Sequence, residues 1–467
     1  MTSLRGHLTW ACTLIGCLVA VYFLWPRAAT TPLERQAVAE GRTVITYWDR
    51  HSGHEYEARA ALINEFNESQ DEVYVRSVPV GYNALMEKTL TSIAGSAPPD
   101  ILSIDSAMLA QLAFQGLFTS LDDFVADIPC LQEGAFMPHV WKMIHFGGHL
   151  WAAGTTTDTY CLIWNKAAFR RAGLDPERPP KTLGEIEEYA AKLTVRNASG
   201  AIEQMGFLPW LPWDRTYMWG VMFGGTWYDE AQGRMVAAGD PHIRASLEWQ
   251  QSFTVDPNAQ EQLPYAMRPD RIAAFSKGIG EYFSANNPFY SGKVAMISEG
   301  EWQVTFIPKY APGLDWGVAP LPQPEGVAPL GYGETCVADA IPITARHPEA
   351  AKKFLRWFYA PRPDGRPSPA SDYCYAIHNI PCRTAEALQE RFIRNPKFKV
   401  FVDQLTTRPV TPLPVTPIMQ FIMDQTERLR EWVTFRKITP EEAAQRIDDL
   451  CNRALERAWD QINRSRI

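Results

Sequence analysis

The first part of the chain alternates β-branched apolar runs with amphipathic segments. Residues 43–48 form a β-branched and aromatic run, which predicts a strand. Residues 55–69 place Leu62, Ile63 and Phe66 on one face between charged positions, which predicts a helix. The same pair of patterns then recurs twice, with strands expected at 73–80 and 101–104 and helices at 82–94 and 107–115. This alternation predicts an α/β fold with a mostly parallel sheet covered by helices on both faces.

The pattern breaks near residue 120 and then resumes. The run at 210–227 is dense in Trp, Pro and Gly and is interpreted as a loop with a packed turn. The chain has 467 residues, which is too long for one ordinary core and suits two domains. The later elements are expected as strands at 160–164 and 294–297, and as helices at 183–193, 348–360 and from about 417 onward.

Residues 1–27 carry the targeting signal. After Arg5 the chain is free of charge from residue 8 to residue 25, which is near the lower limit for a membrane-spanning helix. We interpret this segment as an uncleaved transmembrane anchor, followed by a polar stalk at 28–42. A cleaved signal peptide and a lipoprotein signal ending at Cys17 are the alternatives. All three place the rest of the chain outside the cytoplasm, on the periplasmic or cell-surface side.

Composition and charge exclude several classes of function. The formal net charge is −8 and no block of Lys and Arg is present, so we expect no nucleic-acid partner. The sequence has no nucleophile elbow, phosphate-binding loop or metalloprotease helix, and no Cys/His spacing typical of zinc. We therefore expect neither an enzyme nor a cofactor or metal. Cys374 and Cys382 could form a disulfide or remain buried thiols.

Aromatic side chains beside polar ones indicate where a ligand could bind. Ligands of parallel sheets bind outside the carboxyl ends of the strands, which here points to three loops. A carbohydrate needs flat rings for its C–H face and carboxylates or amides for its hydroxyls. Two later segments supply the same combination. The candidates are Trp48, Asp49, His51, Tyr82, Asp105 and Ser106 from the loops, and Trp213, Asp214, Glu299 and Trp302 from the later segments.

The order of short segments resembles the extracellular solute-binding proteins of family one, the carbohydrate-binding proteins of ABC importers. The similarity spans residues 43–360, and the ordered set is far more specific than any single piece. The matching segments include ITYWD at 45–49, PPDIL at 98–102, GLFTSLD at 116–122, LIWNK at 162–166, GKVAM at 292–296, GEW at 300–302, DWGVAPLP at 315–322 and HPEAAKKFL at 347–355.

The resemblance implies a two-lobed periplasmic-binding-protein fold of type II that closes on its ligand about a hinge. Three chain crossings are expected near 155–160, 327–334 and 370–378. They divide the chain into a first lobe of 43–155 plus 335–370 and a second lobe of 156–330 plus 371–467.

The resemblance also implies roles for individual residues. Trp302 resembles the stacking aromatic of the family, and Asp158 resembles an acidic ligand contact. Asp49 and Asp105 match polar contacts of the first lobe, while Gly331 and Tyr332 lie at a crossing. The implied partners are a carbohydrate and the permease subunits of an ABC importer, with the protein itself a monomer. A binder of a polyamine, peptide or metal chelate, a ligand sensor and a sugar-active enzyme remain as alternatives.

Overall fold

The computed structural model describes residues 31–465 except 96, 127, 214, 279 and 281–283. Its largest sheet has the strand order β16-β6-β15-β3-β1-β2. Strands β1, β2 and β3 are parallel, whereas β15 and β16 run antiparallel to their neighbours. The bounds are β1 Thr43–Asp49, β2 Val73–Pro79, β3 Ile101–Asp105, β6 Ala153–Thr157, β15 Cys336–Ala340 and β16 Ile380–Pro381.

The helices of this first part follow from the amphipathic pattern. Each predicted helix is present, and Gly116, with a φ of +75°, follows the end of the third one. Phe66 of α3 packs against Phe354 of α14, and Phe354 in turn packs against Tyr47 of β1. The helices are α3 Gly53–Ser69, α4 Tyr82–Ala94, α5 Ser106–Phe114 and α14 Pro348–Tyr359.

A buried ion network lies under β1. Arg59 of α3 has no exposed surface, and its guanidinium lies 3.2 Å from Asp49 and 3.5 Å from Asp339 of β15. It also donates to the Tyr47 hydroxyl at 2.6 Å and lies 4.1 Å from the centre of the Tyr373 ring. One charged side chain therefore connects the helix α3 to two strands of the sheet.

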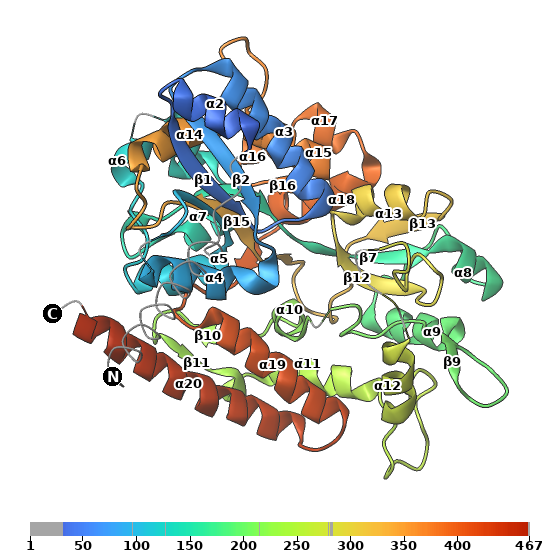
Figure 1. The fold of residues 1–467 in the computed structure, drawn as a ribbon. Coiled ribbons are helices and arrows are strands. Elements are labelled where there is room, and N and C mark those ends of the chain that lie inside the picture. Colours follow the sequence, from blue (N-terminus) through green and yellow to red (C-terminus); the bar gives the residue numbers. More distant parts are fainter. Residues whose placement is uncertain are drawn as a thin grey trace, which may run out of the picture.

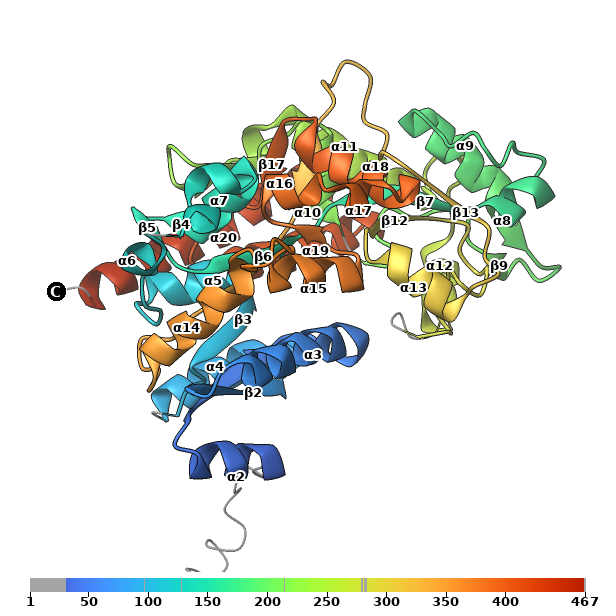
Figure 2. The ribbon, with the colours of Figure 1, turned by 90° about the horizontal axis from the view of Figure 1, so that it is seen from above.

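The second sheet differs from the expectation. It consists of β7 Tyr160–Asn165 between β12 Met296–Gly300 and β13 Trp316–Ala319, and both pairings are antiparallel. The prediction of a mostly parallel sheet in each lobe is therefore wrong for this sheet and only half right for the first. Helices α8 Lys166–Arg171, α9 Leu183–Leu193 and α13 Gln303–Tyr310 lie beside it, at the opposite end of the molecule from α14 (Figure 1; Figure 2).

Four helices form a layer along one side of the molecule (Figure 1). Helix α20 packs on α19, and both pack on α11. The segment 210–227, predicted to be a loop, contains the helix α10, whose Trp219 is fully buried. The bounds are α10 Thr216–Met222, α11 Pro241–Ser252, α19 Met419–Thr434 and α20 Pro440–Ser465.

The remaining elements are short. They are α2 Pro32–Ala39, α6 Asp122–Val125, α7 Pro138–Ile144, α12 Pro269–Lys277, α15 Pro369–Ile377, α16 Thr384–Ala387, α17 Glu390–Ile393, α18 Pro396–Thr406, β4 His145–Phe146, β5 His149–Leu150, β8 Val195–Arg196, β9 Ile202–Gln204, β10 Tyr228–Asp229, β11 Arg234–Met235, β14 Gly331–Gly333, β17 Val410–Pro412 and 3-10 turns at Pro129–Leu131, Glu133–Ala135 and Ala237–Gly239.

Two crossings between the sheets lie where they were expected. The chain leaves the first sheet after β6 and enters the second at β7, and it returns between β14 and β15. The third crossing is later than the predicted 370–378, because α15 packs on α3 and β16 pairs with β6 in the first sheet. Helix α18, beyond α16, contacts β7 and β13. The division into two moving lobes stays a prediction.

Two further predictions concern the start of the chain. The predicted membrane anchor at 1–27 lies outside the described residues. Within the part that the structure describes, no helix is both long and apolar enough to cross a membrane. The predicted stalk contains α2, which packs on β1 and β2 and buries Glu34 against Arg76 at 3.1 Å. The folded body therefore begins about ten residues earlier than expected.

The cysteines in the described residues are free thiols, Cys374 and Cys382 among them. The sulfur of Cys382 lies 3.4 Å from that of Cys336, while the Cys374 thiol donates to the carbonyl of Thr155 at 3.5 Å. The structure therefore supports the second of the two alternatives, buried thiols.

Candidate functional site

The two early crossings lie side by side and form the floor of the site. The Thr335 hydroxyl donates to the Asp158 carboxylate at 2.8 Å, and the Asp158 amide donates to the Thr335 carbonyl at 3.2 Å. The Glu334 amide donates to the Asp158 carbonyl at 3.2 Å. These bonds hold side chains from the ends of both sheets within reach of one another.

Acidic side chains converge on this floor. Asp105, at the end of β3, makes an ion pair of 2.5 Å with Arg50, and Glu334 makes one of 3.1 Å with Arg215. Glu301, just after β12, accepts from the amide of Thr159 at 3.3 Å. The site thus draws carboxylates from the first sheet, the crossings and the second sheet.

Burial sets the protonation behaviour of these carboxyls. It raises the pKa of Asp105 and of Glu334, although Arg50 and Arg215 oppose the shift. Burial and the neighbouring charge of Asp158 raise the pKa of Glu301 well above 4.5. The negative charges of Asp105 and Asp158 also raise the pKa of Glu334, so these groups interact electrostatically.

Aromatic rings line the same region. The guanidinium of Arg215 lies 4.1 Å from the centre of the Tyr160 ring, and the Trp302 ring meets Tyr160 edge-on at 5.9 Å. A Cβ at Gly300 would lie 2.3 Å from the Trp302 ring. Glycine therefore allows this ring to fold back onto the end of β12, where it stays partly exposed beside the carboxylates.

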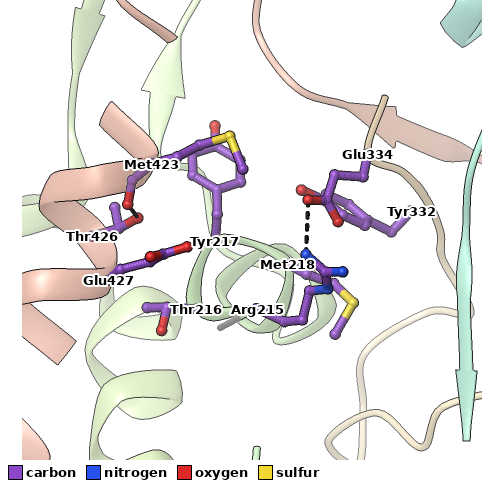
Figure 3. A pocket seen from close by; sticks show the side chains of 9 residues that line it. All are labelled: Arg215, Thr216, Tyr217, Met218, Tyr332, Glu334, Met423, Thr426 and Glu427. Carbon is purple, nitrogen blue, oxygen red and sulfur yellow. Dashed lines mark hydrogen bonds and ion pairs between the residues drawn. The ribbon is translucent and has the colours of Figure 1, made fainter. Parts of the chain in front are cut away.

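A small pocket opens beside Glu334 (Figure 3). The space in it that a water-sized group can occupy is about 10 Å³. That is far below the roughly 300–1,000 Å³ typical of small-molecule sites, so it has room for one small group of a ligand and not for a whole ligand. Its lining comes from α10 and the residue before it, from the second crossing and from α19, and comprises Arg215, Thr216, Tyr217, Met218, Tyr332, Glu334, Met423, Thr426 and Glu427.

Several predicted site residues meet here. Asp105, Asp158, Trp302 and Tyr332 all lie at or beside the crossings. Ser106 is buried next to them, where its hydroxyl accepts from the Cys336 amide at 3.2 Å.

Two more predicted residues have mainly packing roles. Glu299 is buried in β12, where it is paired in register with Cys161 and its carboxylate accepts from the Gln303 amide at 3.3 Å. Gly331 allows close packing of two segments, since a Cβ there would lie 2.2 Å from the Gln404 carbonyl oxygen.

Other predicted residues have different surroundings. Asp49 is fully buried between Arg59 and His51, and the His51 ring lies 2.9 Å from the Asp49 carboxylate. Although burial alone would raise the pKa of Asp49, these two neighbours lower it. Trp48 is partly buried on the opposite face of β1.

Of the last three candidates, only Trp213 has its side chain among the described residues. Trp213 is exposed to solvent over about a third of its surface (37%). Asp214 lies outside the described residues, and so does the side chain of Tyr82, at the start of α4.

The sequence reasoning missed Arg50, Arg215 and Glu334. Arg50 stands between two chosen residues, and Glu334 directly follows the Gly331-Tyr332-Gly333 segment that was noted as a crossing. Arg215 was the least visible, because its segment was interpreted as a loop. A charged residue next to a predicted crossing was the available signal in the case of Glu334.

The fold and this inter-sheet site define a class of protein. A family model for bacterial extracellular solute-binding proteins matches residues 52–364, about two thirds of the chain, and the chain belongs to that family.

Individual relatives agree with this assignment. An uncharacterised ABC transporter extracellular-binding protein from Pyrococcus horikoshii is 23% identical over 78% of each chain. The sn-glycerol-3-phosphate-binding periplasmic protein UgpB of Salmonella typhimurium is 23% identical, covering 89% of this chain and 93% of its own. The structure of CpMnBP1 with mannotriose bound superposes with a TM-score of 0.75 at 27% identity, covering 87% of this chain and 99% of the other.

Glu301→Gln tests the electrostatics of the site. The folded protein keeps Glu301 protonated above pH 4.5, the ordinary pKa of a glutamate side chain. Between pH 4.5 and the raised pKa, the folded protein therefore binds more protons than the unfolded chain. The Glu301 contribution to stability is therefore full below pH 4.5 and is lost as pH rises through that window.

Glutamine carries no such titration. As pH rises from 4 to 8, we expect the free energy of unfolding of the variant to increase relative to that of wild type. The increase is about 1.4 kcal/mol for each unit by which the pKa of Glu301 is raised. Urea unfolding across that range measures it. Shifted groups that do not touch Glu301 are common to both proteins and cancel, so a difference independent of pH would contradict the assignment.

Proposed function

We propose that this protein is the substrate-binding component of an ABC importer, located outside the cytoplasm, and that it binds a carbohydrate between its two sheets. Its membership of the solute-binding family supports the binding role. The observation that carries the ligand class is the meeting of Trp302 and Tyr160 with Asp105, Asp158 and Glu334 at the crossings.

This combination suits a polyhydroxylated ligand. Flat rings cover the C–H face of a sugar, and carboxylates and guanidiniums accept from and donate to its hydroxyls. The mannotriose complex of CpMnBP1, which shares the fold and 27% of the aligned residues, supports an oligosaccharide. Our proposed contacts are Asp105, Asp158, Trp302 and Tyr332, together with Arg50, Arg215 and Glu334.

Closure about the crossings would supply the transport signal. A ligand that touches both lobes only when they are closed shifts the population toward the closed form. The residues 1–27 would hold the protein near its permease as a membrane anchor.

A second candidate ligand is sn-glycerol 3-phosphate, which the UgpB relatives favour by their name. A phosphate requires an excess of positive charge. Arg50 and Arg215 are both engaged with carboxylates here, and further carboxyls surround them. The charge of the site therefore favours the carbohydrate.

A thermal-shift screen of the purified full-length protein tests the proposal. A bound ligand stabilises the folded state by about 2.7 kcal/mol at one hundred times its Kd. We expect mannose or glucose oligosaccharides to raise the melting temperature and sn-glycerol 3-phosphate to leave it unchanged. A shift with the phosphate alone would replace the first candidate by the second.

A further inference from the structure

The charges around the crossings do not balance. Among the described residues, more carboxyl groups than guanidiniums interact at the crossings. The carboxyls belong to Asp105, Asp158, Glu301 and Glu334, and the guanidiniums to Arg50 and Arg215.

The buried carboxylates also have unused oxygens. Arg215 binds one oxygen of Glu334, and Arg50 binds one oxygen of Asp105. The second oxygen of each is buried and has no donor with good hydrogen-bond geometry among the described residues, although the Tyr160 hydroxyl is close enough to Glu334 to lower the pKa of that carboxyl. Both side chains are at least 94% buried. A buried acceptor without a donor is costly, so these oxygens require a donor from elsewhere.

The pocket gives such a donor a place. Figure 3 shows the Glu334 carboxylate directed toward Arg215 beside the Tyr332 ring, with Glu427 on α19 beyond the ring of Tyr217. The rings of Tyr217 and Tyr332 form part of its wall. Aromatic faces beside carboxylates favour an ammonium group, which is attracted to both.

We propose that the ligand carries a protonated amine and that this group binds in the pocket beside Glu334. The proposal deepens the carbohydrate assignment and rests on it: the ligand is an amino sugar or an oligosaccharide containing one. The ammonium donates to the unused oxygen of Glu334, and its sugar extends toward Trp302.

Matched ligands separate charge from shape. Binding to the full-length protein is measured by calorimetry for glucosamine oligomers and for N-acetylglucosamine oligomers of equal length, which lack the charge. Mannotriose, spermidine and sn-glycerol 3-phosphate complete the set. A charge-assisted bond to a buried carboxylate contributes about 1.5–3 kcal/mol, so the amine should bind at least about tenfold more tightly than its acetylated partner.

Each other result has a distinct meaning. Equal binding of mannotriose or the acetylated oligomers would overturn the amine and leave the carbohydrate function intact. Spermidine binding alone would support the amine and overturn the carbohydrate, whereas binding of the phosphate alone would overturn both. A protein that responds to none of the five ligands would overturn the proposal.

Two variants locate the group. Glu334→Gln should lower affinity for the amine about tenfold more than it lowers affinity for neutral oligosaccharides, which also contact this side chain. Glu431→Gln, an equal change of charge one turn beyond Glu427 on the exposed face of α19, should leave both unchanged. Equal loss for charged and neutral ligands in Glu334→Gln would contradict an ammonium contact, and far-UV circular dichroism of both variants establishes that they are folded.

Discussion

Arg59→Met should lower the free energy of unfolding by about 3–5 kcal/mol, the largest effect that we expect from a single substitution. Methionine fills much of the space but leaves Asp49 and Asp339 without their shared cation. Both carboxylates lie in fully buried residues. The variant also loses the donor to the Tyr47 hydroxyl at 2.6 Å and the cation–π contact with Tyr373 at 4.1 Å.

Urea unfolding at pH 7 measures this effect. Arg170→Met is the matched control, because it removes the same group from an exposed pair, in which Arg170 lies 2.7 Å from Asp315 with about half of each side chain exposed. Exposed pairs contribute little, so the control should unfold near wild type. Similar midpoints for the two variants would show that the buried network adds no net stability.

The same network gives two predicted site residues surroundings that the sequence did not indicate. Asp49 and His51 follow a strand of a parallel sheet, and the strand-end rule placed them in the ligand site. Their neighbour Arg59 is ten residues from Asp49 along the chain, on a helix that packs over the sheet. No local pattern in the sequence indicates that the Arg59 guanidinium points into the core and forms an ion pair with the Asp49 carboxylate.

Local elements were predictable where local patterns decide them. Helix α9 spans 183–193 as expected, because the hydroxyl of Thr182 accepts from the Glu185 amide at 3.1 Å and fixes its start. The Thr439 and Glu442 side chains likewise cap α20 reciprocally, at 3.0 and 3.1 Å.

Strand direction was not predictable in this way. Strand β7 pairs with β12, more than 130 residues later, and the alternation of apolar residues is the same for parallel and antiparallel partners. The family resemblance pointed to Asp158 and Trp302, which lie beside the crossings, and their role in binding stays a prediction. The ion pair between Glu334 and Arg215 was not predictable, because it forms where three segments meet only in the folded chain.

Trp302→Ala should weaken binding of the carbohydrate about thirtyfold, which corresponds to about 2 kcal/mol, the loss typical of a central aromatic contact. The Trp302 ring is partly exposed beside the carboxyl groups at the crossings. It packs against Tyr160 and lies over Gly300, where the absence of a side chain leaves room for it. It therefore offers a fixed flat surface whose ordering costs the ligand little.

Two comparisons make the result specific. Trp302→Phe keeps a flat ring on Gly300 and should retain affinity within about fivefold, whereas Trp213→Ala removes an exposed indole from the segment before α10 and should leave binding unchanged. Calorimetry with the oligosaccharide that gives the largest thermal shift supplies the affinities. Wild-type affinity in Trp302→Ala, or a larger loss in Trp213→Ala, would move the stacking surface from the end of β12 to the segment before α10, and would place the sugar on the α10 side of Glu334.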